Sequence, residues 1–187
     1  MVINLKKYIY LLVIVIAIII LGIYLNSSNA PYIPLSTEKV KNYSANGVSF
    51  NYSENWEVVN KTGRFVIAYL KDPTVNETDN KPGAAVEISK KAAEGIPLEM
   101  FYDQVKTGAS GVPGYKQISD TKTVVDNETA YEFVANGMDN GIEEQFRVIL
   151  FEKGGYIYMI SCGTRSPTYL TNKNHDFDII INSFKVQ

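Results

Sequence analysis

The sequence is poor in the residues that most often carry chemistry. Among its 187 residues there are one cysteine, one histidine and one tryptophan. A single cysteine, Cys162, excludes a disulfide within the chain, so the fold must rest on a hydrophobic core. The sequence also lacks a glycine-rich phosphate loop, paired cysteine or histidine metal ligands and a G-x-S-x-G nucleophile turn. We therefore predict that the protein is not an enzyme and that it has no cofactor, no metal and no catalytic residue.

The chain also lacks a surplus of positive charge. Lys and Arg number 18 against 20 Asp and Glu, which gives a formal charge of −2. Proteins that bind nucleic acid neutralise phosphates with a basic surface, so this balance argues against a nucleic-acid partner. Charged residues make up 20% and hydrophobic residues 45% of the chain, which excludes a disordered protein and fits a globular core.

A long apolar run follows the first seven residues. Residues 8–25 carry no charge, and as a helix they would span about 27 Å, close to the roughly 30 Å hydrocarbon core of a bilayer. Lys6 and Lys7 precede the run and the next basic residue is Lys39, so the positive-inside rule places residues 1–7 in the cytoplasm. We predict a signal-anchor transmembrane helix over 8–25, with the lipid bilayer as its partner. The protein would then be a single-pass protein of the cell membrane with an extracytoplasmic C-terminal part.

Cleavage of this segment is the alternative. Ser28-Asn29-Ala30 loosely resembles a signal-peptide cleavage site. The apolar run is longer than a usual signal core and Pro31 would follow the cut, so an uncleaved anchor is favoured. Residues 26–42 are polar and contain two prolines, which predicts a stalk. Residues 43–187 are expected to form one extracytoplasmic domain.

Hydrophobic periodicity in this domain predicts four strands, a helix, four strands and a second helix. The strands are expected around 48–52, 56–58, 64–70, 84–88, 115–125, 128–137, 142–153 and 156–163, and the helices around 97–108 and 177–184. Turn residues between the last four strands, such as Asp126-Asn127 and Gly154-Gly155, are typical of antiparallel hairpins. Two central strands are apolar on both faces, so the sheet needs cover on both sides. The predicted fold is α+β, a central antiparallel sheet in ββββ-α-ββββ-α order sandwiched by helices.

Several phrases of the sequence resemble the PsbP-like family. GVSFNYSENWEVV (residues 47–59) is similar to the start of these domains, although Ser53 stands where proline is usual. The strands YEFVA and FRVILFEKGGYIYMISC and the closing helix, which ends in Ser183-Phe184, are also similar. The resemblance implies a sheet between helices and covers roughly residues 43–187. The family includes a photosystem subunit, a nuclear-import factor that binds a small GTPase, and membrane-tethered prokaryotic proteins, the group this chain resembles most. No functional residue of these relatives is matched here.

Two groups of residues are the remaining candidates for chemistry. A dyad of Cys162 and His175 is conceivable across the last strand and the last helix, but Cys162 is in phase with the apolar residues of its strand and is better read as a core residue. Asp139, Glu143 and Glu144 form an acidic cluster beside a turn. Their spacing does not fit a known Ca²⁺ loop, so a solvated turn is favoured.

The sequence contains six N-x-S/T triplets, more than chance predicts. The first, at Asn26, lies too close to the predicted membrane segment to be used. The candidate glycosylation sites are Asn42, Asn51, Asn60, Asn76 and Asn127. An asparagine-rich composition with many turns is the alternative explanation of these triplets.

These patterns favour a membrane-tethered, non-enzymatic binding or assembly module of the cell envelope, with another envelope protein as its expected partner. The alternative is an extracytoplasmic domain that binds a glycan or a small solute. The 13 tyrosines are the only sign of such a ligand, because exposed aromatic rings stack on sugars.

Overall fold

A computed structural model describes residues 39–60, 63, 65–75, 82–165 and 167–187. The predicted transmembrane segment 8–25 and the stalk up to residue 38 lie outside the described residues. Within the described part of the chain, neither helix has the length and apolar character needed to cross a bilayer.

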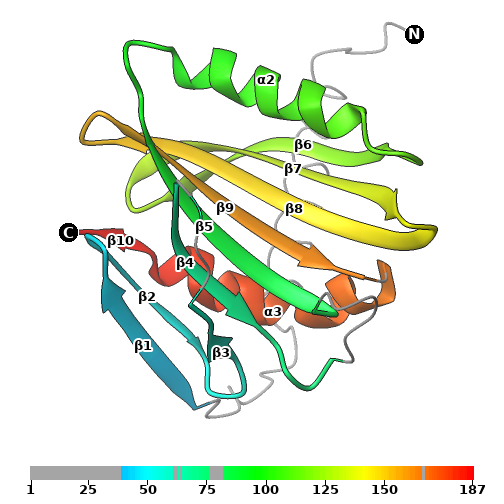
Figure 1. The fold of residues 1–187 in the computed structure, drawn as a ribbon. Coiled ribbons are helices and arrows are strands. Elements are labelled where there is room, and N and C mark those ends of the chain that lie inside the picture. The colour runs from blue at the N-terminus through cyan, green and yellow to red at the C-terminus, as the bar shows by residue number, and fades with distance from the viewer. Residues whose placement is uncertain (1–38, 61–62, 64, 76–81, 166) are drawn as a thin grey trace, which may run out of the picture. The chain divides into compact units, whose positions relative to one another are not determined.

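The described residues form ten strands and two helices (Figure 1). In chain order they are β1 (Val40–Ala45), β2 (Val48–Ser53), β3 (Glu57–Val58), β4 (Val66–Lys71), β5 (Ala84–Ala92), α2 (Leu98–Ser110), β6 (Lys116–Val125), β7 (Glu128–Asp139), β8 (Ile142–Lys153), β9 (Tyr156–Thr164), α3 (Pro167–Ser183) and β10 (Lys185–Val186). All eight predicted strands and both predicted helices are present, which confirms the α+β class. The predicted order is incomplete, because β1 precedes the first expected strand and β10 follows the last helix.

The strands belong to two antiparallel sheets instead of the single sheet that was predicted. Seven strands form the large sheet in the order β3-β4-β5-β9-β8-β7-β6, and three form a small sheet in the order β1-β2-β10. The strands of the small sheet come from both ends of the described chain, and Lys185 of β10 pairs with Ser49 of β2. Such a pairing depends on residues more than a hundred positions apart, so local periodicity does not indicate it.

The strand β1 begins inside the range assigned to the stalk. Only Tyr43 of β1 is partly buried, so the strand has no apolar alternation that sequence analysis can detect. The Tyr43 ring stacks on Phe50 with ring centroids 4.7 Å apart, and the Tyr43 hydroxyl donates a hydrogen bond to the carbonyl of Ile67 at 2.8 Å. Phe50 in turn stacks on Phe184, close to β10. Phe184 meets Phe151 of β8 edge to face with ring centroids 5.7 Å apart, so aromatic packing joins the small sheet to the large one.

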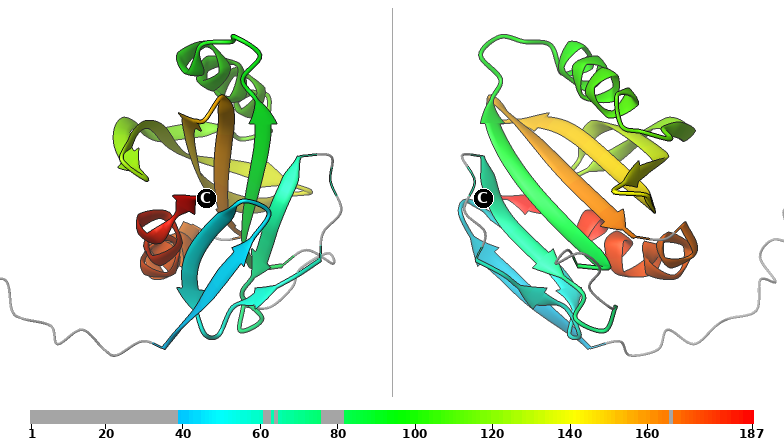
Figure 2. Two further views of the ribbon diagram at one scale, coloured as in Figure 1. Left: turned by 90° about the vertical axis from the view of Figure 1, so that its left-hand side faces the viewer. Right: turned by 45° about the vertical axis from the view of Figure 1, so that its right-hand side comes forward.

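The two helices cover opposite faces of the large sheet (Figures 1 and 2). On one face α2 packs over β7 and β8, where Tyr102 meets Phe133 edge to face. On the other face α3 and the small sheet cover a second core, in which Phe177 contacts Trp56. The predicted sandwich of a sheet between helices is therefore confirmed.

The face under α2 is only partly covered. In β5 the side chains of Ala84, Val86 and Ile88 are buried toward α3, whereas the alternate residues Ala85 and Glu87 are half-exposed on the α2 face. Because α2 packs over β7 and β8, the α2 face of β4, β5 and the C-terminal half of β9 stays open to solvent. This open half carries the candidate site.

Candidate functional site

A groove of about 360 Å³ lies on the open half of the large sheet. Its lining comes from β4, β5, β8, β9 and the chain next to them, and none of it comes from α2. Four strands that are hydrogen-bonded neighbours therefore form its base, which makes the groove a pre-organised feature of the fold.

Small residues form the floor of the groove. The strand register places Ala85 of β5 beside Gly163 of β9, and Glu87 of β5 beside Ser161 of β9. A Cβ atom added to Gly163 would meet no atom within 4 Å, so open space lies directly above it. The hollow exists because these adjacent positions carry little side chain.

Larger side chains border this floor. Phe146 of β8 is the register partner of Gly163, and Tyr69 of β4 is the partner of Glu87. Both rings are half-exposed. The two aromatic rings therefore lie on either side of the floor, and an extended segment bound there would pack apolar atoms between the rings.

One end of the groove is charged. Arg165, directly after β9, has a side chain that is only 5% exposed. Its Nη1 atom lies 3.0 Å from Asp139 Oδ2 and 3.2 Å from Glu144 Oε1. Glu87 adds a further carboxylate to the lining. Each of these charged groups already has a partner in the structure, so their charges do not by themselves select the sign of a ligand.

The structure separates Cys162 from any role in this groove. Strand alternation places its side chain in the core under α3, where it is fully buried, and only its backbone borders the groove. Burial raises the pKa of the thiol to about 12, which keeps it protonated near neutral pH. His175 is exposed on α3. A protonated, buried thiol is a poor nucleophile, which disfavours the dyad of Cys162 and His175.

The predicted acidic cluster is divided in two. Asp139 and Glu144 share the guanidinium of Arg165, whereas Glu143 accepts a hydrogen bond from Asn136 at 3.5 Å. In the described part of the chain no group of three or more His, Cys, Asp or Glu residues is placed to hold a metal ion. The turn after β7 is thus exposed at Asn140, Gly141 and Glu143, as predicted, whereas Asp139 and Glu144 are ion-paired with Arg165. Arg165 is not among the predicted site residues, although alternation in β9 places the residue after Thr164 on the groove face.

The candidate glycosylation sites differ in their surroundings. Asn42 and Asn51 are directly opposite each other in β1 and β2, and the Asn42 amide donates to Asn51 Oδ1 at 3.1 Å. Glycans on both would compete for one space, because opposite Cβ atoms are only about 5 Å apart. Asn127 is exposed in the β6–β7 turn and Asn60 is exposed after β3, whereas Asn76 lies outside the described residues. Glycosylation at these residues stays a prediction.

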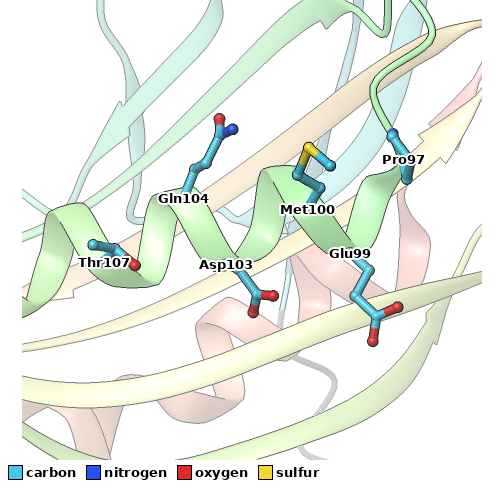
Figure 3. A pocket seen from close by; sticks show the side chains of 6 residues that line it. All are labelled: Pro97, Glu99, Met100, Asp103, Gln104 and Thr107. Carbon is cyan, nitrogen blue, oxygen red and sulfur yellow. The ribbon is translucent and has the colours of Figure 1, made fainter.

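A larger hollow of about 650 Å³ runs along α2 (Figure 3). It is lined by Pro97 and by five side chains of α2, namely Glu99, Met100, Asp103, Gln104 and Thr107. In Figure 3 Met100 and Gln104 point one way and Glu99 and Asp103 the other way, so the side chains diverge from one face of the helix instead of converging. A hollow with a single wall offers a ligand no opposing contact, so the groove over β5 and β9 is the stronger candidate site.

Comparison with known proteins places the chain in a fold group. The family model described as PsbP-like protein matches residues 11–186. No curated protein sequence matches the chain significantly.

Several solved structures resemble the fold at low identity. LpqN of Mycobacterium tuberculosis, described as involved in cell envelope biogenesis, has a TM-score of 0.61 and 9% identity, covering 80% of this chain and 91% of that chain.

Two further structures have the same fold. The cyanobacterial PsbP of Synechocystis has a TM-score of 0.55 and 15% identity, covering 82% of this chain and 96% of its own. The Ran-binding protein Mog1p of Saccharomyces cerevisiae has a TM-score of 0.56 and 8% identity, covering 80% of this chain and 96% of its own. Likeness at such identities shows the fold alone, because one fold hosts unrelated functions.

Proposed function

The chain belongs to the family of PsbP-like proteins, and from that premise we propose that it is a non-enzymatic binding module of the cell envelope, tethered by residues 8–25. Its partner is another envelope protein, which places an extended segment in the groove over β5 and β9. The observation that carries the proposal is the floor of Ala85, Ser161 and Gly163, which leaves room for a segment on an otherwise continuous sheet.

The shape of the groove supports a protein segment over a small solute. Small ligands are usually enclosed on most of their surface. This groove is a shallow depression on a sheet face, so a bound molecule would keep one side in water. An extended peptide gains from such a surface through contacts spread along its length.

The groove also presents polar groups to a protein segment. The described lining residues include the carboxylates of Glu87 and Glu144 and the guanidinium of Arg165, which is also paired with Asp139. Polar groups of the partner segment can exchange hydrogen bonds with these side chains.

Photo-crosslinking in intact cells tests the proposal. A photoreactive residue at position 161, in the groove floor, should crosslink to one envelope protein, whereas the same residue at position 100, an exposed site on α2, should not. Adding Gly163→Trp should abolish the crosslink by filling the groove. Gly108→Trp is the matched control, because a Cβ atom at Gly108 also meets nothing within 4 Å but lies on α2.

Each outcome decides between the candidate functions. One protein captured from position 161, and lost with Gly163→Trp alone, supports the proposal. Capture of a glycan from position 161 supports the ligand-binding alternative. Equal capture from both positions, or a crosslink that survives the filled groove, overturns the assignment of the groove.

A further inference from the structure

The two ends of the large sheet differ in the length of their edge strands. One end closes with β3, which has two residues, whereas the other ends in β6, which has ten. In the described part of the chain, β6 pairs with β7 alone. Proteins commonly shorten or cover such edges, because unpaired N–H and C=O groups accept another strand. The long edge of β6 is therefore a surface on which another strand can pair.

The hairpin defines which backbone groups of β6 point outward. The turn Asp126-Asn127 has φ angles of 51° and 67°, typical of a two-residue hairpin loop. The flanking residues of such a loop form a hydrogen-bonded pair, and these pairs then alternate along the strands. The alternation leaves the N–H and C=O groups of Asp120, Lys122 and Val124 pointing away from β7.

The side chains of this edge are distributed in a regular way. Asp120 and Lys122 lie on the α2 face. There Asp120 accepts a hydrogen bond from the Tyr102 hydroxyl at 2.6 Å and forms an ion pair with Lys106, and Lys122 lies 4.9 Å from the centre of the Tyr131 ring. Thr121 and Thr123 lie on the opposite face. A bulge between Gln117 and Ser119 ends the regular part of the edge.

This pattern is complementary to itself. If a second copy of β6 lies antiparallel to the first with Thr121 opposite its own copy, Asp120 lies opposite Lys122 twice. On the other face Thr123 lies opposite Ser119, and hydroxyl pairs of this kind stabilise strand pairing, as do opposite charges. A register centred on Lys122 would instead oppose two lysines, which is unfavourable.

We propose that β6 pairs with β6 of a second copy of this chain in the register centred on Thr121. The two large sheets then form one continuous sheet across a twofold axis. Val124, which is 64% exposed, loses contact with water at the outer part of this joint. The contact goes beyond the proposed function, since the groove lies over β5 and β9 and needs no second copy.

The contact suits a tethered protein. A single strand pair buries a small area, and an interface of that size is weak between freely diffusing molecules. Tethering to one membrane raises the effective concentration of the copies, so a weak contact becomes populated. The experiment therefore uses the full chain in its own membrane.

A cysteine at position 121 reports the proposed register. In an antiparallel pair, residues that do not exchange hydrogen bonds have Cα atoms about 4.5 Å apart, within the range that a disulfide spans. Thr121→Cys should therefore yield a disulfide-linked dimer on mild oxidation. Val124→Cys is the control, because it would lie opposite residue 118 and about 20 Å from its own copy. The native Cys162 is fully buried and does not interfere.

A second variant tests the backbone pairing itself. Lys122→Pro removes an outward N–H without breaking a bond to β7, and should abolish the dimer formed by Thr121→Cys. Lys122→Arg keeps both the charge and the N–H and should preserve it. A dimer from position 121 only, lost with proline, supports the proposal. No dimer from position 121, a dimer from position 124 as well, or a crosslink to a different protein overturns it.

Discussion

The carboxylate of Asp126 accepts a hydrogen bond from the backbone N–H of Val186 at 2.9 Å. Asp126 lies in the β6–β7 turn and Val186 in β10, so this bond ties the large sheet to the small one. The same carboxylate binds Lys153 at 2.7 Å and Lys185 at 3.0 Å, and its side chain is 5% exposed. A single buried acid thus secures the C-terminal strand.

Asp126→Asn should destabilise the protein by about 2 kcal/mol, because it removes a charge that three donors share. Asparagine tolerates the positive φ of 51° at this position, so the effect reports the charge and not backbone strain. Urea unfolding followed by fluorescence of the buried Trp56 measures the change. Asp103→Asn, an exposed acid on α2, is the control and should change stability by less than about 0.5 kcal/mol.

The same residue predicts a pH dependence. Burial alone would raise the pKa of Asp126, but the hydrogen bonds from Lys153, Val186 and Lys185 outweigh burial and lower it. A lowered folded-state pKa means that the stabilisation is complete above the unfolded pKa of about 3.9 and is lost as pH falls through the folded value. The difference in unfolding free energy between the protein and Asp126→Asn should therefore shrink below about pH 4. A constant difference down to pH 2 would contradict this assignment.

Arg147 should be more important for stability than its exposed acidic partner Asp178. Its guanidinium binds Glu132 at 3.1 Å and Asp178 at 2.7 Å, with 15% of its side chain exposed. Arg147→Ala leaves the 13%-exposed Glu132 without its cation and should cost about 3 kcal/mol. Asp178 is 45% exposed, so Asp178→Asn should cost less than about 1 kcal/mol. Equal losses for the two variants in urea unfolding would refute this ranking.

Truncation tests the role of β1. A chain that begins at Lys39 should unfold cooperatively, whereas one that begins at Gly47 lacks the ring of Tyr43 against Phe50 and the hydrogen bond to Ile67. We expect the shorter chain to be less stable by about 2 kcal/mol or more. Tyr43→Ala in the longer chain should reproduce most of the loss. Equal thermal stability of the two chains would place β1 outside the folded unit.

Cys162 should resist modification until the domain unfolds. The thiol is fully buried and its pKa is raised to about 12, so almost no thiolate exists at pH 8 in the folded chain. Iodoacetamide labelling measured by mass spectrometry should be slow in buffer and complete in urea. Rapid labelling of the folded protein would reopen the question of a reactive cysteine beside His175.

Local chemistry explains which elements could be predicted. The hairpin turns Asp126-Asn127 and Gly154-Gly155 carry residues that adopt positive φ, and the apolar spacing of Phe177, Ile180 and Ile181 requires a helix with one buried face. The strand β1 has a single partly buried residue and gains its structure from pairing with β2. Its sequence therefore has no apolar alternation that predicts a strand. The two-residue strand β10 depends on the same partner.

The sequence by itself determined the fold class, the family and the identity of most core residues, because periodicity and turn chemistry act between neighbours in the chain. Only the tertiary structure decided where the groove lies, since its floor joins Ala85 to Gly163 across β5 and β9. It also decided that Asp139 and Glu144 bind Arg165, whereas Glu143 accepts a hydrogen bond from Asn136. Contacts between distant residues depend on strand order and register, and these follow from the packing of the whole chain and not from any one segment.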